Sequence, residues 1–165
     1  MTPEAAADKL EIVELCTVKH WIYDHDDWAA YDTVFADVVS FPAGQDVDPE
    51  AYLDRFLVPK AELAGALRDI KAGLLTQHLI TGHRVELRGD AAVCWAHSIN
   101  IHFPRADVSS ETLLAKGNEY RFDCVRTNAG WRIRGFIAKN IWAIGNTAAH
   151  DAAAKLSAFS AGQAG

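Results

Sequence analysis

The chain has 165 residues, of which 50% are hydrophobic and 23% are charged. This length and composition are typical of one globular domain whose core is large enough to enclose a pocket. With 16 Lys and Arg against 22 Asp and Glu, the net charge is −6. That balance argues against nucleic acid or an anionic membrane as the main partner.

Three further observations favour a cytoplasmic protein. No apolar run approaches the roughly 20 residues that a membrane span requires. Residues 1–5 lack the basic and apolar regions of a secretory signal. Cys16, Cys94 and Cys124 lie far apart in apolar stretches and form no Cys-x-x-Cys motif, which indicates reduced thiols in the core.

The first half of the chain predicts helices. Apolar residues recur near helical spacing from about residue 5 to 23, and the acidic run 24–27 interrupts this helix. We then expect a short helix over 28–36, a strand over 38–41, a helix over 48–56 and another over 60–74. Pro49 suits the first turn of its helix, where an amide hydrogen is not needed.

The second half predicts strands over 75–81, 83–87, 91–103, 113–127 and 131–142, with turn residues such as Gly82 and Gly89-Asp90 between them. Long strands joined by short turns indicate a strongly curved antiparallel sheet. Helices followed by strands predict an α+β fold with the helices on one face of the sheet. We expect one domain over 1–145 and an Ala-rich tail, to which we assign no chemistry, over 146–165.

Several titratable side chains stand where apolar residues would fold better. Tyr23 and Asp24 end an apolar helical stretch, whereas His78, His102 and Asp123 lie within apolar strands. Burying such groups costs a few kcal/mol each unless they are paired. Departures of this kind tend to mark functional sites, and histidines with carboxylates are the groups used in general acid–base catalysis.

Side chains alternate between the two faces of the strand predicted over 91–103. One face is bulky and apolar and carries Trp95, Ile99, Ile101 and Phe103; the other is small and increasingly polar and carries Cys94, Ala96, Ser98, Asn100 and His102. Small residues leave space beneath the helices, so we place His102 in a pocket. The bulky face needs its own cover, which predicts a homo-oligomer, either a dimer or a trimer.

The order of several short motifs points to a known group. Between about residues 10 and 142 the chain carries Tyr23-Asp24-x-x-Asp27-Trp28, Thr76-Gln77-His78, Gly89-Asp90-x-Ala92, His102 and Arg126-Thr127-x-x-Gly130-Trp131-Arg132-Ile133. In this order and spacing the motifs resemble the SnoaL-like, scytalone dehydratase-like branch of the nuclear transport factor 2-like superfamily. The resemblance implies a cone-shaped α+β barrel in which helices wrap around a curved sheet and enclose a deep pocket.

The resemblance also implies the site. The family's Tyr–Asp pair, its histidine after Thr-Gln and its second histidine match the expected catalytic residues Tyr23, Asp24, His78 and His102. The family's second tyrosine falls near Phe41, and its Ser-x-Asn pair falls on Arg121 and Asp123, so the substrate contacts differ. The expected substrate-binding residues are therefore Asp123, Asn100, Phe41, Trp28 and Arg121.

These residues lead us to expect a cofactor-free lyase of the dehydratase type, acting on a small apolar hydroxy-carbonyl or polyketide-like metabolite. Asp24 holds one imidazole, with His102 as the first choice, and the two histidines share proton abstraction and protonation of the departing hydroxyl. Tyr23 polarises the carbonyl. A cyclase or a double-bond isomerase needs the same constellation, and a pocket that only binds a small molecule is a further alternative.

Simpler roles compete with several of these assignments. Asp24 could cap a helix, Tyr23 could be plain core, and Asp123 could pair with Arg121 or Arg134. His20 and His25 are expected at the surface, His83 and His97 in structural or interface positions, and four tryptophans in the core or the pocket wall: Trp21, Trp28, Trp131 and Trp142.

Other chemistries lack their motifs. Two histidines and two carboxylates could bind a metal, but no His-x-His or His-x-x-x-His pair places two ligands on one face. The sequence also lacks a nucleophile elbow, a phosphate loop and a dinucleotide fingerprint. We therefore expect no metal site.

Overall fold

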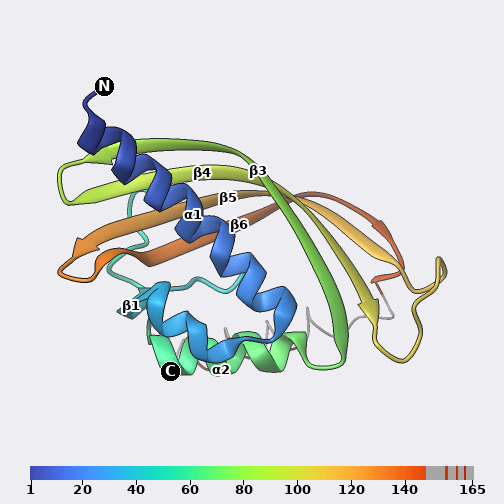
Figure 1. Ribbon diagram of the computed structural model, residues 1–165. Coiled ribbons are helices and arrows are strands. Elements are labelled where there is room, and N and C mark those ends of the chain that lie inside the picture. The colour runs from blue at the N-terminus through green and yellow to red at the C-terminus, as the bar shows by residue number, and fades with distance from the viewer. Residues whose placement is uncertain (148–154, 156–158, 160–161, 163–165) are drawn as a thin grey trace.

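Two helices lie on one face of a six-stranded sheet whose long strands arch over them (Figure 1). The computed structural model describes residues 1–147, 155, 159 and 162. Within them the elements in chain order are α1 (Pro3–His25), the 3-10 helix η1 (Trp28–Thr33), β1 (Phe35–Ser40), β2 (Leu57–Pro59), α2 (Lys60–Lys71), β3 (Leu74–Arg88), β4 (Ala91–Pro104), β5 (Leu114–Thr127) and β6 (Gly130–Gly145). Most of the predicted tail therefore lies outside the described residues.

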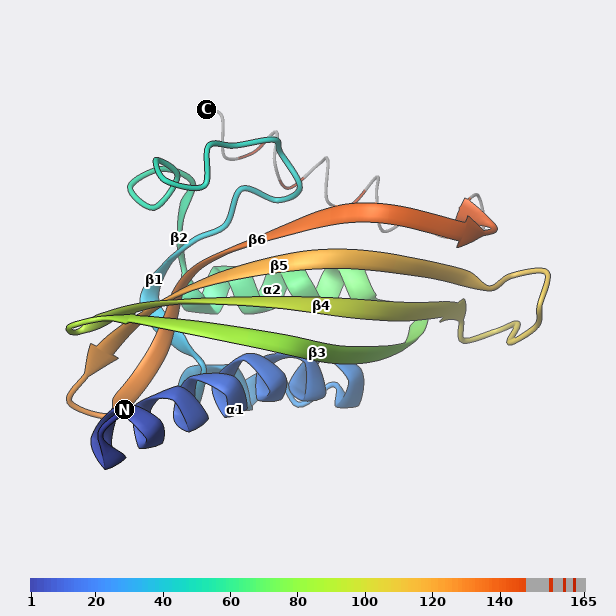
Figure 2. The ribbon, with the colours of Figure 1, turned by 90° about the horizontal axis from the view of Figure 1, so that it is seen from above.

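The strand order in the sheet is β2-β1-β6-β5-β4-β3. The long strands β3 to β6 are antiparallel neighbours and lie side by side in Figure 2. This arrangement of helices on a curved sheet confirms the predicted α+β class. The sheet differs from a fully antiparallel barrel in two respects, because β1 runs parallel to β6 and the sheet is not closed.

The long first helix follows from its sequence. The Thr2 hydroxyl accepts a hydrogen bond from the Ala5 amide at 3.2 Å, and Pro3 occupies the first turn. The helix ends at Asp26, whose left-handed backbone (φ 60°) is a conformation that Asp tolerates better than most residues. Between these caps, α1 packs against β3, β4 and β6. It therefore runs two residues past the predicted end, to His25.

Tertiary contacts override local signals in three places. The helix predicted over 48–56 is a series of turns, because Tyr52 is drawn into the interior, where its hydroxyl donates to Asp123 at 2.6 Å. The predicted helix over 28–36 stops at Thr33, and Phe35 begins a strand that pairs with β6. Gly82 is a bend with φ +67° inside the continuous strand β3, not a turn between two strands.

The predicted faces of β4 are confirmed. Cys94, Ala96, Ser98 and Asn100 are buried beneath the helices, whereas Ile99 is 46% exposed on the opposite face. The three cysteines are buried and form no disulfide, as expected for core thiols. None of the helices in the described part of the chain is long and apolar enough to cross a membrane.

Candidate functional site

A cavity of about 320 Å³ lies between the two helices and the inner face of the sheet. Its apolar wall includes Phe41, Leu67, Ile70, Phe136 and Ile137. Its polar wall includes Lys19, Tyr23, His78, Asn100, His102, Lys116, Asn118 and Tyr120. A mostly apolar cavity with a few polar groups is the usual form of a small-molecule site.

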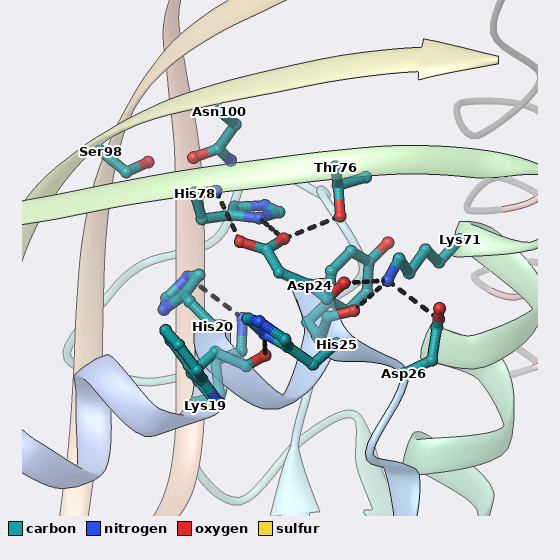
Figure 3. A network of polar contacts seen from close by, with 12 residues as sticks. Lys19, His20, Asp24, His25, Asp26, Lys71, Thr76, His78, Ser98 and Asn100 are labelled. Atoms are coloured by element: carbon teal, nitrogen blue, oxygen red, sulfur yellow. Dashed lines mark hydrogen bonds and ion pairs between the residues drawn. The ribbon is translucent and has the colours of Figure 1, made fainter. Parts of the chain in front are cut away.

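Asp24 and His78 form a tight pair at the edge of this cavity. The His78 ring donates through Nδ1 to Asp24 Oδ1 at 2.7 Å, and the Thr76 hydroxyl donates to the same oxygen at 2.7 Å. The second oxygen accepts the His78 backbone amide at 2.7 Å. Figure 3 shows the carboxylate between the His78 ring and the Thr76 hydroxyl. Thr76 and His78 are two residues apart on β3, so one carboxylate reaches both.

The end of α1 that carries Asp24 is held by Lys71 at the end of α2. The buried Lys71 ammonium donates to the Asp24 carbonyl oxygen at 2.8 Å and forms an ion pair with Asp26 at 2.9 Å. Arg105 binds the other Asp26 oxygen at 2.6 Å. Because Lys71 satisfies carbonyls left free at the helix C-terminus, it fixes the place from which the Asp24 side chain reaches β3.

The contacts of this pair determine its protonation. Burial raises the pKa of Asp24, but the hydrogen bonds from His78 and Thr76 outweigh burial and leave the pKa below its usual value. Burial lowers the pKa of His78 by more than the neighbouring carboxylate raises it. At neutral pH Asp24 is therefore an anion and His78 a neutral imidazole. With the proton held on Nδ1, the Nε2 lone pair is left to act as a base.

His102 lines the cavity as predicted by strand alternation, and its ring centre lies 5.8 Å from that of His78. The expected partnership of Asp24 with His102 differs from the structure, in which Asp24 holds His78. The reason is geometric, because the end of α1 faces β3, the strand that carries His78. His102 is left as a second imidazole on the cavity wall.

Three other expected residues line the same cavity. The Tyr23 ring packs edge-on to His78 with ring centres 5.4 Å apart, and burial raises the pKa of Tyr23, so its hydroxyl stays protonated. Asn100 donates through Nδ2 to the Tyr120 hydroxyl at 3.4 Å. Phe41 stacks on Phe136 at 4.8 Å.

The remaining expected residues lie elsewhere. Trp28 packs on Tyr23 and Tyr31 outside the cavity lining. Arg121 and Asp123 point to the opposite face of β5, where the segment before β2 covers them. There Asp123 pairs with Arg121 at 3.0 Å and accepts the Tyr52 hydroxyl, while Arg121 also binds Glu50. Asp123 therefore forms the ion pair with Arg121 that was the alternative to a role in substrate binding.

Two residues near the site, Lys19 and His20, were not predicted from the sequence. His20 was expected at the surface, and this prediction is wrong, because both side chains are buried. A signal was present, since Lys19 lies three residues after Cys16 and seven after Ile12, on the stripe that α1 buries. Trp21, expected in the core or pocket wall, is instead exposed and stacks on His25.

The arrangement supplies a fixed base, a second imidazole and a protonated phenol around one apolar space. Within the described residues, no three His, Cys, Asp or Glu side chains come together in a group that could hold a metal ion. The groups present suit proton transfer to and from a small organic molecule.

Several solved structures share this fold. The Kfla4162 protein from Kribbella flavida is 24% identical, with a TM-score of 0.73 over 93% of this chain and 99% of its own. A protein from Novosphingobium aromaticivorans named "Putative Scytalone Dehydratase" is 11% identical, with a TM-score of 0.71 over 88% of this chain and 92% of its own. A nuclear transport factor 2-like superfamily protein from Salmonella enterica is 15% identical, with a TM-score of 0.66 over 82% of this chain and 92% of its own.

None of the curated proteins compared with this chain matches it. At these identities the structural neighbours show a shared fold. The sequence itself carries the family assignment, because the model of the SnoaL-like domain matches residues 4–136, which include Tyr23, Asp24, His78 and His102. The chain therefore belongs to the SnoaL-like domain family, within the nuclear transport factor 2-like fold.

Proposed function

We propose that the protein is an acid–base lyase that removes water from a small, mostly apolar hydroxy-carbonyl compound. The observation that carries the proposal is the Asp24–His78 pair, joined at 2.7 Å, with His78 on the wall of an apolar cavity. A buried carboxylate that fixes the tautomer of a histidine is a common way to prepare a base. The dehydratase name of one structural neighbour supports the same reaction class.

In the proposed reaction His78 Nε2 takes a proton from the carbon next to the substrate carbonyl. The electron pair of that C–H bond moves toward the carbonyl oxygen, which Tyr23 polarises with its hydroxyl. The electrons then return to form the carbon–carbon double bond, and the hydroxyl on the next carbon leaves as water with a proton from His102. Positioned acid–base groups contribute roughly 100- to 10,000-fold each.

Asp24 does not line the cavity, so its role is to position His78 and to stabilise the imidazolium that forms. His102 completes the reaction as the acid because its ring lies beside that of His78 on the same wall. The two imidazoles thus divide the two proton transfers of an elimination between them.

A double-bond isomerisation or a ring closure begins with the same proton removal. The cavity around His78 serves these reactions equally well, and the position of the substrate hydroxyl decides between them. Product mass separates the outcomes, because elimination loses one water whereas isomerisation keeps the mass of the substrate.

The first step can be measured without the natural substrate. We expect the protein to accelerate exchange of the hydrogens next to the carbonyl of 2-tetralone in D₂O, followed by proton NMR. His78→Asn removes the base and should lower this rate about 100-fold or more. His97→Asn is the matched control, because His97 is an exposed histidine on β4 that does not line the cavity.

A second assay tests elimination itself. We expect 3-hydroxy-1-indanone to lose one water, detected by mass spectrometry and by the absorbance of the conjugated product. Exchange that is no faster than in buffer, or that is equally fast in the His78→Asn variant, would contradict the proposal.

A further inference from the structure

Lys19 is a buried cation without an anionic partner. Its side chain is 5% exposed, and its ammonium lies on the wall of the cavity. Its neighbours there are neutral: Nζ lies 4.6 Å from the centre of the Phe136 ring and 5.3 Å from that of Tyr120. No carboxylate of the described residues lies close enough to form an ion pair with it, and the Asp24 carboxylate at the edge of the cavity acts on Lys19 only from a greater distance, where it raises the pKa of Lys19 less than burial lowers it.

The side chain that contacts the Lys19 ammonium, His20, is an acceptor without charge. His20 Nδ1 donates to the Cys16 carbonyl at 3.0 Å, so its proton resides on that nitrogen. The other nitrogen, Nε2, faces Lys19 Nζ at 3.5 Å and accepts from it. Burial lowers the pKa of His20 well below its usual value, so His20 adds no positive charge and cannot neutralise the ammonium.

The rest of the described cavity wall adds positive charge and no negative charge. Lys116 lines the same space, and none of the described lining residues is Asp or Glu. This contrasts with a chain whose net charge is −6. A charge in an apolar space without a directly contacting counter-ion is costly, and an anion that enters the cavity would remove much of that cost.

A second residue on the wall, Asn100, has one hydrogen-bonding atom that is not used by the described residues. Asn100 is 5% exposed, and its Oδ1 has no hydrogen-bond partner among the described residues. Its Nδ2 contacts the hydroxyl of Tyr120, the residue whose ring lies beneath Lys19. In the described part of the chain, a cation without an ion-pair partner and an amide whose oxygen has no donor thus lie beside the same aromatic residue, which is the pattern of a site built for a polar group of a ligand.

We propose that Lys19 is the counter-ion for an acidic group of the ligand, so that the cavity selects apolar compounds that carry one anionic oxygen group. Asn100 Oδ1 accepts a hydrogen bond from a hydroxyl of the same ligand. This inference rests on the proposed function and adds the substrate class, an apolar hydroxy-carbonyl compound with an acidic group. Burial, which lowers the pKa of Lys19 to about 8, leaves the side chain mostly protonated at neutral pH and thus able to serve in this way.

The test compares two ligands of nearly equal shape, 1-naphthoate and its neutral amide 1-naphthamide, by titration calorimetry at pH 7. We expect the unmodified protein to bind the carboxylate about 10-fold or more tighter than the amide, since a hydrogen bond to a charged group contributes more than one between neutral groups. Lys19→Met should weaken naphthoate by that factor and leave naphthamide within about twofold, which also shows that the cavity is intact.

Lys139→Met is the control, because it removes the same charge from an exposed position on β6 outside the cavity lining. It should not change either affinity. Equal affinities for the two ligands, no binding of naphthoate, or naphthoate binding that survives Lys19→Met would each overturn the proposal. Because neither ligand reacts, this binding test is independent of the lyase proposal. A protein that prefers naphthoate but does not accelerate exchange of 2-tetralone would support the anion site and contradict the lyase.

Discussion

Among single residues, the histidine beside Asp24 has the most closely defined chemical state. Burial lowers the pKa of His78 below 6.5, despite the opposing effect of the carboxylate. The neutral form is the base, and a lower pKa means that this form persists to lower pH. We therefore expect kcat/KM for exchange of 2-tetralone to stay level down to pH 6.5 and to fall only below it, as measured in a pH–rate profile.

The Asp24→Asn variant provides the control for this profile. The carboxylate raises the pKa of His78, so its loss should shift the acidic limb to still lower pH while the rate falls about 100- to 10,000-fold. An acidic limb that lies above pH 6.5 in the unmodified protein would contradict the assignment of His78 as the base.

The buried ammonium of Lys19 makes a separate prediction about stability. Its pKa is about 8 in the folded protein against 10.5 ordinarily, so the unfolded chain binds this proton more readily. The resulting penalty is full below pH 8 and disappears as pH rises through 10.5. Lys19→Met should therefore raise the free energy of unfolding by about 1–3 kcal/mol at pH 7, as measured by urea titration.

The pH dependence of this gain distinguishes charge from shape. The advantage of the methionine variant should shrink at pH 9 to 10, where the lysine of the parent protein loses its proton. A gain that does not change with pH would show that better apolar contact, and not the buried charge, is responsible. A loss of stability at pH 7 would contradict the prediction.

At the residue scale, the sequence predicted which side chains lie near the pocket better than it predicted their hydrogen-bond partners. The family motifs and strand alternation put Tyr23, Asp24, His78 and His102 in one region, which is where the structure brings them together. Which histidine Asp24 holds depends on the angle at which α1 crosses the sheet, and no local pattern encodes that angle.

Two further residue assignments failed for reasons of burial. Lys19 was overlooked because a lysine on a helix usually lies in water, although its spacing placed it on the buried stripe. Asp123 was expected in the pocket because the family's Ser-x-Asn pair falls on Arg121 and Asp123, but it lies on the other face of β5. The structure shows why, since the segment before β2 covers the second face of β5 and supplies Tyr52 as the partner of Asp123.

At the scale of elements, the junction between α1 and α2 holds the site together. Lys71→Met removes donors from the carbonyls at the end of α1 and leaves buried acceptors unpaired. We expect the free energy of unfolding to fall by roughly 2 kcal/mol or more, measured by urea titration. The exchange rate should fall as well, because the same contacts place Asp24.

Lys60 offers a matched control at the other end of α2. Its ion pairs with Asp32 and Asp37 involve largely exposed carboxylates, so Lys60→Met should cost less than about 1 kcal/mol. Equal losses from the two substitutions would show that Lys71 does not stabilise the junction beyond an ordinary surface ion pair.

Most elements could be predicted from periodicity, and the exceptions share one cause. The long strands and both long helices appear close to their expected limits. The predicted helix over 48–56 had suitable capping residues, but burial of Tyr52 against β5 outweighs the weak preference of a short helix. Gly82 was expected to be a turn because its alternative, an irregularity within one continuous strand, depends on pairing with β4 before and after residue 82, which the sequence does not identify.

At the scale of the whole molecule, the face of the sheet opposite the helices carries a group of exposed apolar side chains. Leu79 on β3 and Ile99 on β4 are direct cross-strand partners and are 49% and 46% exposed. Ile99 pairs in turn with Gly117 on β5, over which the Trp142 side chain from β6 lies. These four residues form a continuous row across four strands.

We propose that this row is the interface of a homo-oligomer. Light scattering should give at least twice the mass of one chain, with about 800 Å² buried per partner in a standard interface. Ile99→Glu places a charge at the centre of the row and should give a monomer or an aggregate, whereas Val38→Glu, at an exposed apolar position on β1, should leave the mass unchanged. Because the cavity lies on the opposite face, a soluble Ile99→Glu monomer should still exchange 2-tetralone. A monomeric parent protein would contradict the proposal, since the row would then be stable in water without a partner.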